Sequence, residues 1–234
     1  LKCRQHRHGY RFSIDAVLLA HFIAPGNNGI LLDLGAGCGI VSLLLAYRWP
    51  QLAVTALELQ PRLAALCRHN AAVNGFAERI AAVEGDFRRM GDFFRAGSFS
   101  WVVANPPYRP SNHGRLSGGE EQAVARHELS GGLDELVKAI AFALKTRGRA
   151  ALVYPAARSA ILLAALKAAR LEPKRLQVVY SYPGSAGRLM LVEAVKGGGE
   201  GMSILPPFYI YDSPGGQYAP EMARCYAPLI PVVG

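Results

Sequence analysis

The chain has 234 residues, of which 51% are hydrophobic and 18% are charged. A chain of this length buries a sizeable core in one large or two small domains, and its longest apolar runs are too short to cross a bilayer, so we expect no membrane span. The formal net charge of +9 favours a polyanionic partner such as nucleic acid, and the absence of a secretory-type N-terminal segment favours a cytoplasmic protein.

Short apolar runs alternate with amphipathic segments along the central part of the chain. The apolar runs predict seven strands, over 30–34, 53–57, 80–83, 99–104, 150–154, 176–180 and 189–195. The amphipathic segments predict four helices, over 39–47, 61–74, 134–144 and 157–169. This order predicts an α/β, Rossmann-like fold, with a seven-stranded, mostly parallel sheet and helices on both faces. The last two strands are joined without a helix, so we expect a C-terminal antiparallel pair.

The predicted elements between residues 30 and 196 form the core of a single domain. A run of three glycines at 197–199 leads into a segment rich in proline and tyrosine, which we expect to be an irregular C-terminal arm over 197–234. The polar loop over 109–119 follows the fourth strand directly, and a doubly wound fold carries its functional groups in such loops.

A glycine-rich turn follows the first predicted strand, in the sequence Asp33-Leu34-Gly35-Ala36-Gly37-Cys38-Gly39. Such a turn allows close approach of a nucleotide cofactor to the backbone, and we assign Asp33, Gly35 and Gly37 to cofactor binding. Position 40 is Ile, where the dinucleotide motif places a third small residue against the pyrophosphate. The turn therefore fits a nucleoside without phosphates, although glycine spacing alone does not separate a dinucleotide from S-adenosylmethionine.

Two acidic residues end the next two predicted strands. Glu58 ends the second strand, where a carboxylate can accept hydrogen bonds from both ribose hydroxyls; a solvated acid at a strand end is the alternative. Asp86 ends the third strand and could accept from an adenine amino group while Phe87 lies against the ring. Asp86 could equally cap the following helical turn, or serve both purposes.

The sequence Asn105-Pro106-Pro107-Tyr108 follows the apolar fourth strand. Two prolines stiffen this turn and remove two N–H donors, so that carbonyls remain available to a ligand. The Asn105 amide oxygen and the Pro106 carbonyl can accept the two hydrogens of an aromatic amine, whose delocalised lone pair makes it a poor nucleophile. Held in this way, the nitrogen can aim its lone pair at a sulfonium methyl group, while Tyr108 stacks on the base. An ordinary proline turn is the alternative.

These motifs, in this order, resemble those of class I methyltransferases that modify amino groups, with their [ND]PP[YFW] motif. Further segments resemble the bacterial tRNA (adenine-N6)-methyltransferase family, over almost the whole chain: Gln5, 9–20, 125–129, 188–193, 206–207 and 210–212. The resemblance implies S-adenosylmethionine as donor and an exocyclic base amine of RNA as acceptor, adenine N6 of a tRNA. It also implies a cofactor lid within residues 1–29, with Asp15 as a contact, and a second role for Asn105 at the cofactor.

Basic residues flank the predicted site on both sides. After the catalytic motif come Arg109, His113 and Arg115, which with Tyr108 we assign to substrate binding. A second basic cluster, at residues 2–11, could hold further phosphates, and a scattered solvated surface is the alternative for these charges.

Four other functions compete with this interpretation. A protein glutamine amide poses the same hydrogen-bonding problem to an NPPY turn, and so does the N2 amine of guanine in ribosomal RNA. The missing third small residue counts against an NAD-dependent oxidoreductase, and Asn105 with a complete cofactor turn counts against a non-catalytic RNA-binding module.

The four cysteines are widely spaced without a CxxC pair, so we predict no metal site and no disulfides. We expect a monomer or a weak dimer.

Overall fold

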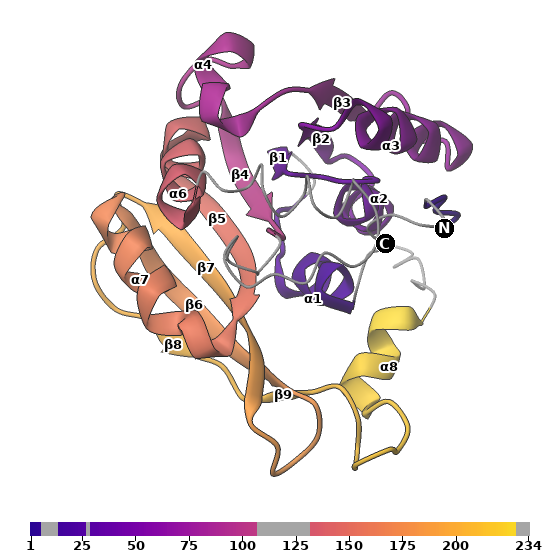
Figure 1. Ribbon diagram of the computed structural model, residues 1–234, viewed down its shortest axis with the longest axis vertical. Coiled ribbons are helices and arrows are strands. Elements are labelled where there is room, and N and C mark those ends of the chain that lie inside the picture. Colours follow the sequence, from indigo (N-terminus) through magenta and orange to yellow (C-terminus); the bar gives the residue numbers. More distant parts are fainter. Residues whose placement is uncertain (6–13, 27–28, 107–131, 228–234) are drawn as a thin grey trace, which may run out of the picture.

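The computed structural model describes residues 1–5, 14–26, 29–106 and 132–227 of the chain. Within these ranges, strands join into one sheet with the order β3-β2-β1-β4-β5-β7-β6-β8, and β9 pairs with β6 (Figure 1). The strands are β1 (Ile30–Leu34), β2 (Ala53–Glu58), β3 (Ile80–Glu84), β4 (Phe99–Ala104), β5 (Leu144–Pro155), β6 (Leu171–Tyr180), β7 (Gly187–Lys196), β8 (Ser203–Ile204) and β9 (Phe208–Tyr209).

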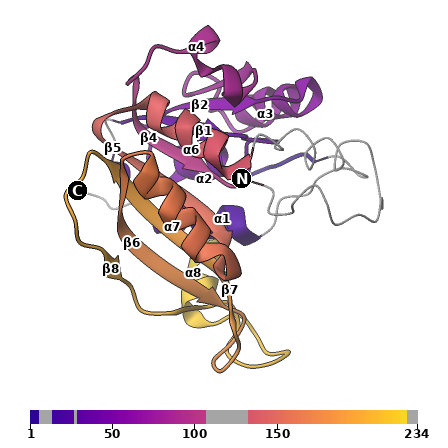
Figure 2. The same cartoon turned by 60° about the vertical axis from the view of Figure 1, so that its left-hand side comes forward.

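Helices cover both faces of the sheet. They are α1 (Ile14–Phe22), α2 (Ile40–Arg48), α3 (Pro61–Val73), α4 (Met90–Phe93), α6 (Gly132–Ala143), α7 (Ser159–Ala168) and α8 (Pro220–Tyr226), with 3-10 turns η1 (Phe87–Arg89) and η3 (Ala156–Arg158). Figure 2 shows α6 and α7 in front of the sheet, with α1 and α2 behind it. Among the described helices, none combines the length and hydropathy that crossing a membrane requires.

The central strands are buried on both faces, and this explains why they are almost continuously apolar. In β4, Trp101 and Val103 join the core cluster under α1, α2 and α3. Their neighbours Val102 and Ala104 join the second cluster, under α6 and α7. The two-residue alternation of a strand thus divides one apolar run between two cores.

The predicted fold class is confirmed, and all seven predicted strands are present. Strands β1 to β5 pair in parallel, whereas β7 is antiparallel to both of its neighbours, β5 and β6. The expected antiparallel pair is therefore correct. Its second strand, β7, lies between β5 and β6 because the connection through α7 leaves one strand position free between these two strands.

The sequence pattern missed the regular elements at the two ends of the chain. The segment 197–234, expected to be irregular, contains β8, β9 and α8. Two-residue strands and a seven-residue helix are too short to produce a recognisable period. In α1, apolar residues occupy almost every position and most are buried, so no amphipathic pattern marks this helix. The division into a lid, a core and an arm stays a prediction.

Truncation of a core side chain should cost far more stability than truncation of an exposed one. Leu152 is fully buried in β5, between Ala104 of β4 and Val192 of β7. We expect Leu152→Ala to lower the free energy of unfolding by about 2–5 kcal/mol in urea titrations. The control is Ile161→Ala on α7, where the side chain is 55% exposed, with an expected change within about 0.5 kcal/mol. Similar losses for both variants would contradict the assigned burial.

Candidate active site

The candidate site lies where four parallel strands end at one edge of the sheet. Leu34 of β1 is opposite Ala104 of β4 and also opposite Leu57 of β2. The residues that follow these positions, Gly35 and Asn105, therefore come side by side. The strand order reverses at β1, since β2 and β3 lie on one side and β4 on the other (Figure 1). Open α/β sheets bind their ligands at such a reversal.

The three glycines of the turn serve two different purposes. All three have positive φ, at +74° for Gly35, +58° for Gly37 and +84° for Gly39. A Cβ atom on Gly35 or Gly37 would meet nothing within 4 Å, so this side of the turn is open. A Cβ atom on Gly39 would lie 2.5 Å from Sγ of Cys67 in α3. The first two glycines thus leave space for a ligand, and the third allows close packing of the turn on α3.

Glu58 is held against the glycine turn by backbone donors. Glu58 is the last residue of β2 and is only 6% exposed. Its Oε2 accepts a hydrogen bond of 2.7 Å from the Gly37 N–H, and its Oε1 accepts one of 2.9 Å from the Gln60 N–H. The carboxylate is therefore oriented at the edge of the turn, beside the backbone that the sequence assigns to the cofactor.

Asp33 points to an internal partner that the sequence reasoning missed. Its Oδ2 accepts from the N–H of Ser42 at 3.1 Å and from the Ser42 hydroxyl at 2.6 Å. The residue is 2% exposed, and burial raises the pKa of Asp33 to about 6, although the Ser42 bonds act in the opposite direction. The carboxyl group thus ties α2 to β1 behind the turn, and its assignment to cofactor binding stays a prediction.

Asp86 caps the turn η1, which was one of the two roles considered for it. Its Oδ1 accepts from the Arg88 N–H at 2.9 Å, and its Oδ2 forms an ion pair of 2.6 Å with the Arg88 guanidinium. The hydrogen bonds from Arg88 hold the pKa of Asp86 below its usual range. An adenine contact by Asp86 stays a prediction, and it must compete with this ion pair.

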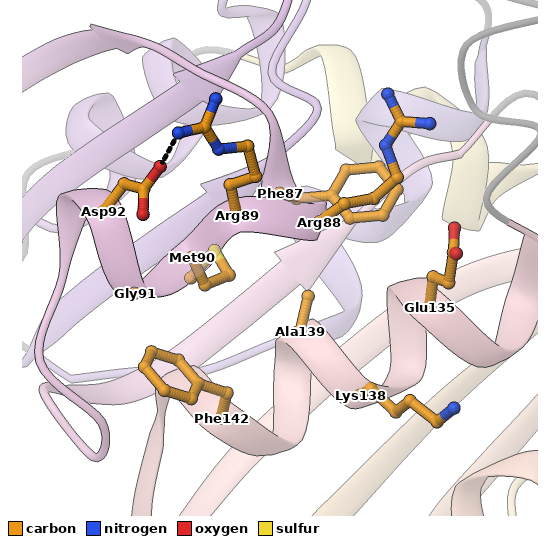
Figure 3. A pocket seen from close by; sticks show the side chains of 10 residues that line it. All are labelled: Phe87, Arg88, Arg89, Met90, Gly91, Asp92, Glu135, Lys138, Ala139 and Phe142. Atoms are coloured by element: carbon orange, nitrogen blue, oxygen red, sulfur yellow. Dashed lines mark ion pairs between the residues drawn. The ribbon is translucent and has the colours of Figure 1, made fainter.

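Phe87 lines a pocket of about 450 Å³ between η1, α4 and α6. Figure 3 shows its ring facing Ala139 of α6, with Met90 and Phe142 further along the same pocket. The residues of the glycine turn do not line this pocket, which therefore lies beside the candidate site rather than in it. Phe87 is 7% exposed and packs in the second core cluster, so its contact with an adenine ring stays a prediction.

The catalytic motif is described only in its first half. Asn105 is half-buried and Pro106 is buried, directly after β4. Asp15, half-buried in the first turn of α1, is described as well, but its place at a cofactor stays a prediction. The predicted substrate residues lie outside the described part of the chain: Tyr108, Arg109, His113 and Arg115.

Asn70 of α3 is a further residue of this region that the sequence did not reveal. It is fully buried, and its Nδ2 donates to the carbonyl oxygens of Cys38 at 2.9 Å and Arg4 at 3.0 Å. Its Oδ1 accepts from the Arg4 N–H at 2.8 Å. One turn later, Asn74 brackets Lys2 in the same way. The two asparagines hold residues 1–5 along α3, and Asn70 places the backbone of Arg4 beside that of Cys38 in the glycine turn.

The pKa of Asp33 predicts a pH dependence of stability. Its pKa in the folded state is about 6, above the ordinary value of 3.8, so the folded chain binds more protons between these values. The contribution of Asp33 is therefore fully present below about pH 4 and is lost as the pH rises through 6. Relative to the wild type, Asp33→Asn should gain roughly 2 kcal/mol between pH 4 and pH 7. A difference between the two unfolding free energies that stays constant over this range would refute the prediction.

The two glycine environments predict unequal effects of alanine. Both Gly37→Ala and Gly39→Ala pay about 1–2 kcal/mol for a positive φ. Gly39→Ala should lose about 1–3 kcal/mol more in chemical unfolding, because the new methyl group overlaps Cys67. Adding Cys67→Ala to Gly39→Ala should recover part of this extra loss, and no recovery would show that the overlap is not its cause.

The family models identify the region that carries this site. The model described as "Methyltransferase small domain" matches residues 13–132, just over half of the chain. The match contains the glycine turn, Glu58, Asp86 and Asn105, all of which the sequence assigned to one site.

Curated relatives of this chain come from several bacteria. A protein of Shewanella sp. (strain MR-7) is 34% identical over 148 residues, which cover 63% of this chain and 61% of the relative. One from Porphyromonas gingivalis (strain ATCC BAA-308 / W83) is 31% identical over 78% of this chain and 73% of its own. One from Shewanella amazonensis is 33% identical over 81% of this chain and 79% of its own. Each is named a tRNA1(Val) (adenine(37)-N6)-methyltransferase. The chain spans about three fifths of the length of the first of these relatives.

Solved structures share the fold at lower identity. A predicted O-methyltransferase from Agrobacterium tumefaciens has a TM-score of 0.74 at 22% identity, over 90% of this chain and 94% of that one. TrmN from Thermus thermophilus has a TM-score of 0.57 at 21% identity, over 77% of this chain and 48% of that one. These likenesses concern the fold alone. The family model and the curated relatives confirm the resemblance drawn from the sequence: the chain belongs to the methyltransferase small domain family.

Proposed function

We propose that this chain transfers the methyl group of S-adenosylmethionine to an exocyclic amine of a base in RNA, with N6 of a tRNA adenine as the acceptor. The observation that carries the proposal is the register of β1 and β4, which sets Asn105 beside Gly35 at one edge of the sheet. A donor turn and an acceptor turn that share an edge satisfy the proximity that transfer between two bound molecules requires.

The glycine turn suits a donor that carries a nucleoside. The open side of Gly35 and Gly37 lets such a ligand approach the backbone, and the oriented Glu58 carboxylate beside Gly37 is placed to accept from ribose hydroxyls. S-adenosylmethionine supplies an electrophilic methyl group on its sulfonium sulfur. Asp33 contributes indirectly, because its bonds to Ser42 position the start of α2 behind the turn.

The Asn105-Pro106 corner suits an amine as acceptor. The amide oxygen of Asn105 and the carbonyl oxygen of Pro106 accept the two hydrogens of the amine and so orient its lone pair. Both oxygens also stabilise the positive charge that develops on the nitrogen during transfer. No strong base is required, since a methylated amine that still bears its hydrogens loses a proton readily to water.

An RNA acceptor is supported by charge and by the names of the relatives. The formal net charge is +9, and Asn70 keeps Arg4 beside the glycine turn while Asn74 holds Lys2 at the end of α3, so that both basic residues are available to phosphates. The curated relatives are named for adenine N6 in a tRNA, and the choice of this base and this RNA rests on their names. The cytoplasmic location and the oligomeric state stay predictions.

Removal of the Asn105 oxygen should slow methyl transfer. In assays with labelled S-adenosylmethionine and bulk tRNA, we expect Asn105→Ala to lower the transfer rate by at least about 100-fold, because one preorganised polar contact is lost. Mass spectrometry of digested tRNA should show N6-methyladenosine with the wild type. If the chain methylated a glutamine-containing protein and not tRNA, the acceptor would be a protein, and the proposal of an RNA acceptor would be wrong.

Two matched variants sharpen this test. Asn105→Asp keeps an acceptor oxygen and should retain more activity than Asn105→Ala. Glu58→Gln should weaken S-adenosylhomocysteine binding by roughly tenfold or more in calorimetry, because a charged acceptor becomes neutral. If Asn105→Ala turned over at the wild-type rate, the role of this residue would be wrong. Unchanged affinity in Glu58→Gln would remove Glu58 from the donor site.

A further inference from the structure

Two cysteines that are 35 positions apart in the sequence meet beside the glycine turn. Sγ of Cys3 lies 3.8 Å from Sγ of Cys38, which belongs to the turn itself. The wide spacing of the cysteines predicts no disulfide, and yet the fold brings these two thiols into contact. Neither sulfur is used by the proposed transfer reaction.

Asn70 holds both cysteines in this arrangement. Its Nδ2 lies 3.6 Å from the sulfur of Cys3 and donates to the carbonyl oxygen of Cys38 at 2.9 Å. The bond from the Arg4 N–H to its Oδ1 fixes the residue next to Cys3 as well. One buried side chain therefore bonds to both segments and holds the two sulfurs in contact.

The two thiols differ in accessibility. Cys3 is half-buried, whereas Cys38 is 4% exposed. The hydrogen bond with Cys38 lowers the pKa of Cys3, and the same bond together with burial raises the pKa of Cys38. The thiolate is the reactive form of cysteine, so a small oxidant should reach and attack Cys3 first. Cys38 is then adjacent as the second thiol.

We propose that Cys3 and Cys38 form an oxidation site that hydrogen peroxide converts to a disulfide. The Cys3 thiolate attacks one peroxide oxygen, the O–O bond breaks, and the leaving hydroxide takes up a proton to become water. The resulting sulfenic acid on Cys3 is attacked by the sulfur of Cys38, which loses its proton as the S–S bond forms and a second water leaves. Two thiols and one peroxide thus give one disulfide and two waters.

The disulfide acts on the glycine turn. An S–S bond of about 2.05 Å is much shorter than the present separation of 3.8 Å, so the sulfurs must approach each other. Cys38 lies between Gly37 and Gly39, and the Gly37 N–H is the donor to Glu58. A shift of Cys38 therefore disturbs the bond that orients Glu58. This consequence rests on the proposed function, whereas formation of the disulfide does not.

A metal site at these sulfurs and oxidation at the neighbouring Cys67 are both less consistent with the structure. Among the described residues, no group of three or more His, Cys, Asp or Glu side chains is arranged to hold a metal ion. Cys67 also lies near the turn, but it is 1% exposed and packs against Gly39, so an oxidant has poor access to it. The contact between Cys3 and Cys38 therefore favours dithiol chemistry between this pair.

Thiol counting on the full chain tests the site. The reduced protein should show four thiols in denaturant, one for each cysteine, and peroxide treatment should leave two. Peptide mass spectrometry should find residues 3 and 38 linked, with a loss of two hydrogens that dithiothreitol reverses. Cys3→Ser should form no such link, and Cys225→Ser, altered in α8, should form it as the wild type does.

Three results would overturn the proposal: a thiol loss in Cys3→Ser equal to that of the wild type, a link to Cys67 or Cys225 instead, or oxidation of Cys3 to sulfinic acid without any link. A second measurement separates this site from the proposed function. We expect the oxidised chain to show a smaller thermal shift with S-adenosylhomocysteine than the reduced chain. Absence of any shift in the reduced chain would count against the proposed function, while the linked peptide would still support the cysteine site.

Discussion

Backbone hydrogen bonds between β1 and β4 hold Leu34 opposite Ala104, so the two strands end at the same level. A slip of one residue would turn every side chain of β4 to the other face and exchange its contributions to the two cores. The apolar alternation in β4 therefore selects the register, and the register in turn places Asn105 beside Gly35. The packing of the core and the geometry of the candidate site are consequences of the same pairing.

Buried polar side chains then make the glycine turn rigid. Asp33 binds Ser42, Glu58 binds the Gly37 backbone, and Asn70 binds the Cys38 carbonyl. An unsatisfied buried polar group costs about 1–3 kcal/mol, so each of these bonds strongly favours one position of the turn. A donor site built in this way needs little rearrangement when a ligand binds, which is how preorganised sites lower a reaction barrier.

The sheet beyond β5 is held by a different device. Glu193 of β7 is 1% exposed and forms ion pairs with Arg149 of β5 and with Arg175 of β6, the latter at 2.8 Å. One buried carboxylate thus connects β7 to both of its antiparallel neighbours. On the far side of β6, β8 and β9 pair with its edge, which is thereby covered along part of its length.

The sequence by itself determined the seven main strands, four of the helices between them (α2, α3, α6 and α7), the family and the glycine and proline turns, but not the short helix α4. Each of these depends on residues that are close together in the chain, as periodicity and turn chemistry do. Only the tertiary structure decided that β7 lies between β5 and β6, that α1 is a buried helix, and that Asp33 faces Ser42. It also decided that Asn70 joins residues 1–5 to the turn and that Cys3 meets Cys38. Such partners are chosen by packing and by hydrogen bonding between distant segments, and no local pattern records them.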